Sequence, residues 1–278
     1  MGEHTVVREV VGPWSLATSR RFWEGFAPAA LQGQSGDDLR TVFRVERDWS
    51  AATATVRQAG TAAHITVRGD GDLDAAAEQA ARFLALDVDG RGWPEVGERD
   101  PVIAAARAEL PGLRPCGFHS PYEAAAWAVL SQRLRVAQAA RLRNDLLGDD
   151  GAFPPPRQLR SFDADLPGRK AEYLRAVAEA ALDGVFEGLR ELPAEDAFAR
   201  VRHVKGLGPF AAELVVLRGA NHPDGVPHHE TRLEAEIAFR YGPQATAEQV
   251  SPAWRPYRTW AVLHLRALAD RRTGRPVP

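Results

Sequence analysis

Hydrophobic and polar positions follow two different patterns along the chain. Over the first hundred residues, short runs rich in β-branched residues alternate with stretches of helical spacing, and turn formers such as Gly69-Asp70-Gly71-Asp72 separate them. The predicted strands lie at 41–46, 53–56 and 63–67, and the predicted helices at 15–26 and 73–86. In the second helix, Ala76, Ala80 and Phe83 share one face. The pattern predicts a small α+β unit.

Beyond this unit the spacing becomes almost entirely helical. Gly90-Arg91-Gly92-Trp93-Pro94 interrupts the earlier pattern, and helical sequence follows Asp100-Pro101. We therefore predict a domain boundary near residue 97. A small α+β N-terminal domain (1–97) would be followed by an all-α domain (98–278).

A capping motif marks the start of the longest predicted helix. Ser120-Pro121-Tyr122-Glu123 combines an N-cap serine, a proline at the first helical position and a glutamate at the third. This predicts one helix from there to about Leu147. Further helices are predicted at about 168–184, 195–203, 209–219, 230–241 and 256–272.

Composition narrows the class of protein. With 278 residues, 45% hydrophobic and 26% charged, the chain is long enough for two domains with a sizeable core. Its single cysteine, Cys116, excludes an internal disulfide and a four-cysteine iron-sulfur cluster. The polar N-terminus and the lack of an apolar run of about 20 residues predict no targeting or membrane segment. We expect the protein to be located in a reducing cytoplasm, and at the nucleoid if the host is a bacterium.

Charge is unevenly distributed along the chain. The formal net charge is −2, which argues against a protein that coats nucleic acid generally. Residues 1–100 carry 11 arginines against 16 acidic residues, so the remainder has a positive balance. In the last segment, 251–278, six arginines stand against one acidic residue, Asp270. They are Arg255, Arg258, Arg266, Arg271, Arg272 and Arg275. A cationic face in the second domain and an ordinary solvated surface both fit this excess.

The most informative motif is Val204-Lys205-Gly206-Leu207-Gly208-Pro209-Phe210. Two glycines flank one apolar residue between helical sequences, which describes a tight hairpin with free backbone N–H groups where the second helix starts. Such a hairpin can bind an anion, most plausibly a DNA phosphate. An ordinary connection between two helices would carry the same glycines, and the motif alone does not separate the two alternatives.

Several segments together resemble a known family. Gly206-Leu207-Gly208-Pro209-Phe210-Ala211-Ala212 resembles the hairpin of helix-hairpin-helix DNA glycosylases, and nearly the whole chain is similar to the 3-methyladenine DNA glycosylase II family of that superfamily. The other segments that carry the likeness are Gly12-Pro13-Trp14-Ser15-Leu16, Arg21-Phe22-Trp23-Glu24-Gly25-Phe26, Gly117-Phe118-His119-Ser120-Pro121-Tyr122-Glu123, Val129-Leu130-Ser131-Gln132, Gly168-Arg169-Lys170-Ala171-Glu172-Tyr173-Leu174 and Trp254-Arg255-Pro256-Tyr257-Arg258-Thr259-Trp260-Ala261. Their order and spacing make the resemblance specific.

The resemblance implies a fold, a reaction and a catalytic group. The fold would be an α+β N-terminal domain followed by an all-α helix-hairpin-helix glycosylase domain. The enzyme would flip a damaged base out of duplex DNA and hydrolyse its bond to deoxyribose, which needs a carboxylate near C1′. Glu230 matches the carboxylate position of the family, where aspartate is usual. Its extra methylene puts efficiency and substrate choice in question.

The residues around Glu230 are consistent with an anionic catalyst. Glu230, Leu233 and Ile237 recur at helical spacing directly after Pro227-His228-His229. A carboxylate in a first helical turn meets the positive end of the helix dipole, which favours its ionised form. A glutamate present only for the dipole would give the same pattern.

The hairpin and one loop supply the expected DNA contacts. The residues are Lys205, Gly206, Leu207, Gly208, Phe210, Gln132 and Arg133. Lys205 is expected to contact phosphate or solvent. Arg133, with Leu134 next to it, stands where the resembled family fills the gap left by the flipped base, and an arginine can stack in the duplex there. A surface arginine is the alternative for Arg133.

The residue types at the expected pocket define the kind of glycosylase. Phe210 stands where bifunctional relatives carry a lysine for Schiff-base chemistry, so we expect a monofunctional, hydrolytic enzyme. Aromatic faces hold a flipped, often cationic purine by stacking and cation–π attraction. The expected base pocket consists of Phe210, Trp127, Tyr122, Trp14, Leu214 and Arg266. Core packing is the alternative for the aromatic members, above all for Tyr122 and Trp127.

Two further functions stay open at this point. The first is a lesion-binding protein of the same fold that is catalytically weak or inactive. The second is a metal-dependent hydrolase using His222, His228, His229 and Glu230, which the absence of a His-Glu-x-x-His spacing disfavours.

Expectations about partners follow from the same resemblance. No cofactor and no catalytic metal are expected, although a structural monovalent cation could bridge the hairpin carbonyls and a DNA phosphate. The expected partner is double-stranded DNA containing damaged bases, with no membrane involvement, and the protein is expected to be a monomer.

Overall fold

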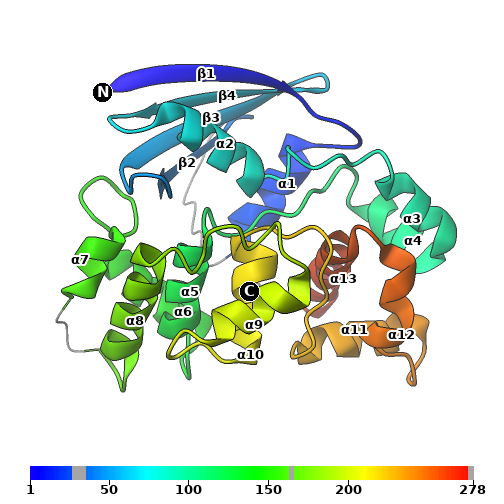
Figure 1. Ribbon diagram of the computed structural model, residues 1–278. Coiled ribbons are helices and arrows are strands. Elements are labelled where there is room, and N and C mark those ends of the chain that lie inside the picture. The colour runs from blue at the N-terminus through cyan, green and yellow to red at the C-terminus, as the bar shows by residue number, and fades with distance from the viewer. Residues whose placement is uncertain (27–35, 163–165, 275–278) are drawn as a thin grey trace.

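The computed structural model describes residues 1–26, 36–162 and 166–274. It is rich in helices and carries one small antiparallel sheet near the N-terminus (Figure 1). The sheet has the strand order β1-β4-β3-β2. Its strands are β1 (Gly2–Glu9), β2 (Leu39–Arg44), β3 (Ala51–Ala59) and β4 (Ala62–Gly69). Arg275, counted above among the C-terminal arginines, lies outside the described residues.

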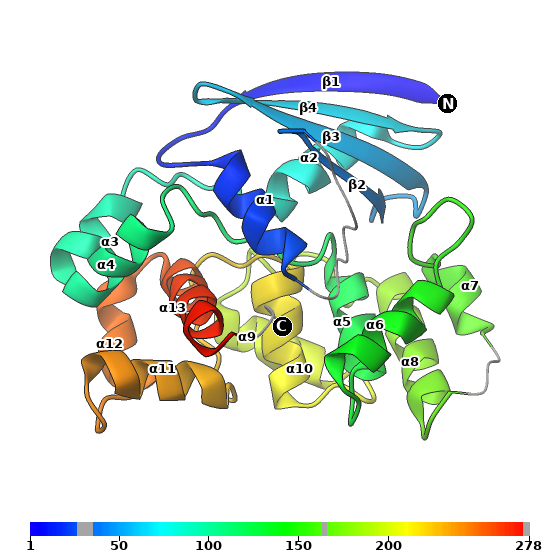
Figure 2. The ribbon, with the colours of Figure 1, turned by 180° about the vertical axis from the view of Figure 1, so that it is seen from behind.

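Alternation of side chains fixes the face of the sheet that packs inward. Val56 lies opposite Ile65 in the pairing of β3 with β4, and both are buried. Helix α2 (Leu73–Phe83) packs on the sheet with Ala76 and Ala80 buried, and Asp72 caps its start by accepting a hydrogen bond from the Ala75 N–H. Helix α1 (Leu16–Glu24) lies between the sheet and the helical part of the molecule (Figure 2).

The predicted strands and both early helices are confirmed within a few residues. The edge strand β1 was missed because its exposed positions carry Glu3, Thr5 and other polar residues, and only its pairing with β4 makes it a strand. This pairing includes Val6 opposite Ile65.

The helical part is built from short helices around two hydrophobic clusters. Their bounds are α3 (Trp93–Arg99), α4 (Pro101–Glu109), α5 (Pro121–Leu130), α6 (Val136–Asp145), α7 (Pro156–Arg160), α8 (Lys170–Leu182), α9 (Ala194–Arg202), α10 (Pro209–Leu214), the π-helix η1 (Val215–Gly219), α11 (Thr231–Tyr241), α12 (Ala247–Val250), the 3-10 helix η2 (Ser251–Trp254) and α13 (Arg258–Thr273). Helix α5 is buried along its whole length in the larger cluster. The smaller cluster joins α3 and α4 to α11 and α13, with Trp254 and Trp260 fully buried.

The single helix predicted from Ser120 to about Leu147 is two helices, so that prediction is wrong. The chain turns after α5, and Arg133 has φ +57° in the left-handed region. Lys170 of α8 stabilises the break, because its Nζ donates to the carbonyls of Val129 (3.0 Å) and Gln132 (2.7 Å). A lysine from another helix thus takes the carbonyls that a further helical turn would have used.

The capping box predicted at the start of α5 forms only in part. The Ser120 hydroxyl accepts a hydrogen bond from the Glu123 N–H at 3.1 Å. The Glu123 carboxylate instead faces His119 and Arg143, each at 3.6 Å. The start of α5 is therefore fixed by the serine and the buried ion pairs together.

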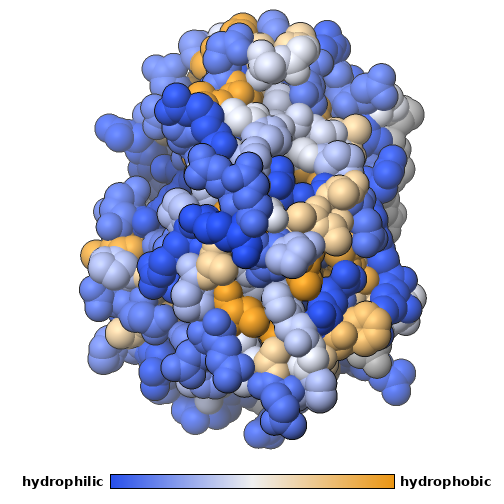
Figure 3. Space-filling model, turned by 90° about the vertical axis from the view of Figure 1, so that its right-hand side faces the viewer, coloured by the Kyte–Doolittle hydropathy of each residue, from blue (hydrophilic) through white to orange (hydrophobic). Residues whose placement is uncertain are grey.

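The outer surface near α3, α4 and α12 is mostly hydrophilic. Figure 3 shows hydrophobic residues there only in small groups among polar ones. Exposed apolar residues that are scattered singly are normal on a protein surface, and they are not by themselves a sign of an interface. Among the described residues, no helix is long and apolar enough to cross a bilayer.

Asp100 joins three helical elements, α4, α11 and η2. Its Oδ1 accepts hydrogen bonds from the N–H groups of Val102 and Ile103 at the start of α4. Its Oδ2 accepts from the Tyr241 hydroxyl (2.7 Å), at the end of α11, and from Trp254 Nε1 (2.8 Å).

We expect Asp100→Ala to lower the free energy of unfolding by about 3 kcal/mol, because it removes a helix cap and leaves two buried donors without acceptors. Urea denaturation measures this. Asp74→Ala, at a carboxylate that is 85% exposed on α2, is the control and should stay within about 0.5 kcal/mol of wild type. Equal stabilities of the two variants would contradict the assignment.

Candidate active site

A cavity of about 220 Å³ lies where α1, α5, α10, η1, α11 and α13 meet. Its walls are largely apolar, with Leu214, Leu217 and Leu263 among them. Trp127 and Phe210 contribute aromatic surface. Such a concave apolar space with a few converging charges is typical of a small-ligand or base pocket.

The structure brings most of the predicted pocket residues to this cavity. Trp127, Phe210, Leu214, Glu230 and Arg266 all line it, although they come from four helices that are distant in sequence. Trp127 is almost completely buried, whereas Phe210 is 54% exposed at the rim.

Two predicted pocket residues lie elsewhere. Tyr122 is fully buried in the core, where its hydroxyl donates to the Pro154 carbonyl (2.8 Å) and its ring packs edge-on against Trp49. Trp14 packs against the core near the N-terminal sheet, and its carbonyl accepts a hydrogen bond from Gln58 Nε2. Neither residue lines the cavity, so the assignment of these two to the base pocket is corrected.

Glu230 is the N-cap residue of α11, in an extended conformation (φ −105°, ψ 93°). Its side chain makes no capping hydrogen bond to the helix and instead forms an ion pair with Arg266 of α13. The side chain keeps about a fifth of its surface accessible (21%), so it faces the cavity without being sealed from it.

Burial and charge act in opposite directions on Glu230. Burial raises the pKa of the Glu230 carboxyl above its usual range, and Arg266, Arg218 and Arg232 partly oppose this by favouring the anion. Asp270 adds a smaller upward contribution to the pKa. The ion pair with Arg266 is therefore the strongest single interaction that keeps Glu230 ionised in an apolar wall.

A second buried arginine belongs to the same site. Arg218 of η1 lines the cavity, donates from Nη2 to the Cys116 carbonyl (3.0 Å) and lies over the ring of Phe26 at 4.7 Å. Burial lowers the pKa of Arg218 to about 10, which leaves it charged at neutral pH. A π-helical turn such as η1 often marks a functional site.

Sequence reasoning missed Arg218, Phe22 and Phe26 as cavity residues. The phenylalanines were noted only within the segment from Arg21 to Phe26 that carries the resemblance, and Arg218, at the end of an apolar run, was not identified. A lone charge directly after Val215-Val216-Leu217 is the signal that could have identified it, because a long buried run rarely ends on an arginine without a reason.

The glycine hairpin forms as predicted between α9 and α10. Gly206 has φ +93°, and a Cβ at this position would lie 2.4 Å from the ring of Tyr173, so only glycine fits. Gly208 is the N-cap of α10 and has open space around it. Leu207 is buried and anchors the hairpin, while Lys205 pairs with Glu172 at 2.6 Å on the surface.

The turn between α5 and α6 lies against this hairpin. Gln132 Nε2 donates to the Gly206 carbonyl at 2.8 Å, which couples the two segments predicted to contact DNA. Arg133 is exposed at the tip of the turn, and Leu134 lines the cavity just behind it.

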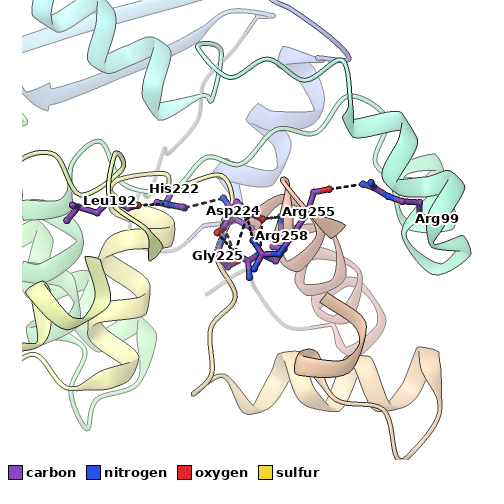
Figure 4. Close-up of polar contacts among 8 residues, drawn as sticks. Arg99, Leu192, His222, Asp224, Gly225, Arg255 and Arg258 are labelled. Atoms are coloured by element: carbon purple, nitrogen blue, oxygen red, sulfur yellow. Dashed lines mark hydrogen bonds and ion pairs between the residues drawn. The ribbon is translucent and has the colours of Figure 1, made fainter. Parts of the chain in front are cut away.

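The loop from η1 to α11 is fixed at its midpoint. Asp224 accepts hydrogen bonds from the side chains of Arg255 and Arg258, and Arg258 begins α13 (Figure 4). His222 Nδ1 accepts from the Asp224 N–H, and its Nε2 faces the Leu192 carbonyl at 3.0 Å. The loop that leads to Glu230 is thus tied to the helix that carries Arg266.

Internal pairing accounts for several of the C-terminal arginines. Arg255 and Arg258 bind Asp224, Arg266 binds Glu230, and Arg272 binds Glu236. Most of the arginines described in this segment therefore pair with acidic residues of the chain and do not form an open cationic face.

The histidines considered as metal ligands do not converge. His222 faces Leu192, His228 faces Glu195, and His229 faces Glu213. In the described ranges, no group of three His, Cys, Asp or Glu side chains is arranged to hold a metal ion. The donor set that the metal-hydrolase hypothesis requires is not assembled.

Comparison with solved structures defines the fold. No family model matches the chain. The 3-methyladenine DNA glycosylase of Archaeoglobus fulgidus superimposes with a TM-score of 0.72 at 18% identity, over 96% of this chain and 98% of that one. The 8-oxoguanine glycosylase/lyase of Clostridium acetobutylicum, solved with duplex DNA, gives 0.60 at 16% identity over 81% of this chain and 86% of that one. The fold is that of the helix-hairpin-helix DNA glycosylases.

Sequence relatives narrow the class. The DNA-3-methyladenine glycosylase of Bacillus subtilis is 24% identical over 66% of this chain and 68% of its own length. DNA-3-methyladenine glycosylase 2 of Escherichia coli is 28% identical over 59% of this chain and 62% of its own length, and glycosylase 1 of Schizosaccharomyces pombe is 29% identical over 44% and 57%. The chain matches about two thirds or less of the length of these relatives. In sequence, the chain is similar to 3-methyladenine DNA glycosylases.

The hairpin geometry gives a paired prediction. We expect Gly206→Ala to lower the free energy of unfolding by about 2 kcal/mol or more, because alanine is strained at this φ and meets Tyr173. Gly208→Ala is the matched control, since its φ of −83° and open surroundings accept a methyl group. Urea denaturation of both proteins compares them, and equal loss at the two positions would contradict the hairpin geometry.

Proposed function

We propose that the protein is a monofunctional DNA glycosylase that flips alkylated purine bases of the 3-methyladenine type out of duplex DNA and excises them by hydrolysis. The observation that carries the proposal is Glu230, a partly buried carboxylate in an apolar, aromatic cavity beside the glycine hairpin. The similarity to DNA-3-methyladenine glycosylases supports a DNA N-glycosylase, and the site chemistry supports the hydrolytic route.

The reaction requires charge stabilisation at the sugar. As the purine departs, positive charge develops at C1′, and an anion close to it lowers the barrier. Glu230 supplies that anion, and the same carboxylate can orient the attacking water. Arg266 and Arg218 favour its ionised form before DNA arrives.

The positions of the lysines support hydrolysis over a Schiff-base route. The chain has two lysines, Lys170 and Lys205. Lys170 donates to carbonyls at the end of α5, and Lys205 pairs with Glu172 on the surface. Neither lines the cavity, where Phe210 stands instead, so no lysine amine is placed to attack C1′.

The hairpin and the turn beside it form the proposed DNA contact. Gly208 leaves the backbone at the start of α10 open to a phosphate, and a monovalent cation could join the hairpin carbonyls to the same phosphate. Arg133 is exposed at the tip of the neighbouring turn, where it would enter the gap left by the flipped base. Phe210 at the rim would stack on that base.

We expect Glu230→Gln to slow release of 3-methyladenine or 7-methylguanine from methylated duplex DNA by at least about 100-fold, since the neutral amide cannot balance the sugar cation. Single-turnover base release measures this. Affinity for duplex DNA with an abasic site should change little, and Glu234→Gln on the same helix should release base at the wild-type rate. Unimpaired release by Glu230→Gln would disprove the catalytic assignment.

The ion pair between Glu230 and Arg266 also affects how the rate of base release depends on pH. Because the pKa of Glu230 is raised, the rate should fall with decreasing pH at a value above the ordinary range of a glutamate. Arg266→Met removes the charge that most favours the anion, so the pKa of Glu230 should rise further and the acid limb should move to higher pH. Single-turnover rates of base release, measured at about ten pH values between 4 and 9, would show this shift. An acid limb that stays in place or moves downward would contradict the role of Arg266.

A further inference from the structure

Glu213 is a buried carboxylate that the proposed reaction does not use directly. It lies on α10, the helix that follows the glycine hairpin, and only 3% of its surface is exposed. A buried carboxylate is costly unless hydrogen bonds compensate it. Its partners therefore show what the burial achieves.

Within the described parts of the chain, three hydrogen bonds reach this carboxylate, all from the two residues just before Glu230. Oε1 accepts from the His228 N–H (2.9 Å) and from His229 Nδ1 (2.7 Å). Oε2 accepts from the His229 N–H at 3.1 Å. Since Glu213 can only accept when ionised, His229 carries its proton on Nδ1 in this contact.

We infer that Glu213 is a positioning residue that fixes the catalytic carboxylate relative to the hairpin. Charge-assisted hydrogen bonds to two successive N–H groups define the backbone direction at His228 and His229, and Glu230 follows immediately. The inference rests on the proposed function, because it assigns a task to Glu213 only if Glu230 acts on DNA.

The geometry explains why such a clamp is needed here. Glu230 lies outside the regular helix as the N-cap of α11, and its side chain makes no hydrogen bond to that helix. Asp224 holds the loop six residues earlier, so without Glu213 the end of the loop would be held by the Arg266 ion pair and by the exposed contact of His228 with Glu195. Glu213 joins α10, and hence the hairpin that begins it, to the residue before the carboxylate.

A misplacement of about 1 Å can cost on the order of 100-fold in rate, so a positioning group can matter without touching substrate. In Glu213→Gln, one oxygen becomes an amide that points a donor at the N–H groups of the loop. We expect single-turnover base release to slow by about 10- to 100-fold, while affinity for abasic-site duplex DNA stays within about twofold of wild type.

A double variant separates positioning from general damage. Because Glu213 acts through Glu230, Glu213→Gln should cause no further loss of rate in a Glu230→Gln background. Glu236→Gln is the matched control, since Glu236 is fully buried on α11 and pairs with Arg240 and Arg272 away from the cavity. It should release base at the wild-type rate.

His229→Ala provides a second variant if Glu213→Gln does not fold. It removes one of the three hydrogen bonds through a side chain that is half exposed, and should slow release in the same direction without weakening DNA binding. Absence of release by the wild-type protein from any alkylated duplex would refute the proposed function itself. Release by wild type together with an unchanged rate in Glu213→Gln or His229→Ala, or additive losses with Glu230→Gln, would overturn the inference alone.

Discussion

The ion pair between Glu230 and Arg266 is the interaction on which the site depends. An apolar cavity suits a purine but disfavours an ionised carboxylate, and the raised pKa of Glu230 reflects this conflict. Arg266 and Arg218 reduce the conflict by placing buried positive charge near the anion. The ion pair of Arg266 and the hydrogen bond of Arg218 offset part of the cost of burying these groups.

Much of the surrounding architecture keeps this pair in place. Helix α13 brings Arg266, and its first residue, Arg258, is tied through Asp224 to the loop before Glu230. The far end of α11 is held through Tyr241 and Asp100, and its near end through Glu213. The hairpin and the turn between α5 and α6 are joined through Gln132, and both adjoin the cavity, the turn through Leu134 and the hairpin through Phe210.

The sequence predicted the parts of the fold that depend on local pattern. Runs rich in β-branched residues located β2, β3 and β4. The two glycines around Leu207 located the hairpin, where Gly206 has φ +93° beside Tyr173. Local pattern failed at the end of α5, because the break depends on Lys170 reaching across from α8. The domain boundary near residue 97 stays a prediction.

The residues of the site were predicted only in part, because local pattern does not show which residues meet in space. Resemblance to a family identified Glu230, Phe210, Leu214 and Arg266. A resemblance can do this because it points to residues that lie together in a fold although they are far apart in sequence. Tyr122 and Trp14 were misassigned because an aromatic residue gives no sign of which cavity it faces until its neighbours, such as the carbonyl of Pro154, are known. Glu213 and Arg218 were missed because their significance lies entirely in long-range partners.

The central claim is that an anion at position 230 stabilises positive charge on the sugar. The most direct test compares the affinity of the protein for two duplexes, one with a cationic pyrrolidine in place of the lesion sugar and one with neutral tetrahydrofuran. The account predicts that wild type binds the cationic duplex at least about tenfold more tightly and that Glu230→Gln loses this preference. Equal affinity of the wild-type protein for the two duplexes would contradict it.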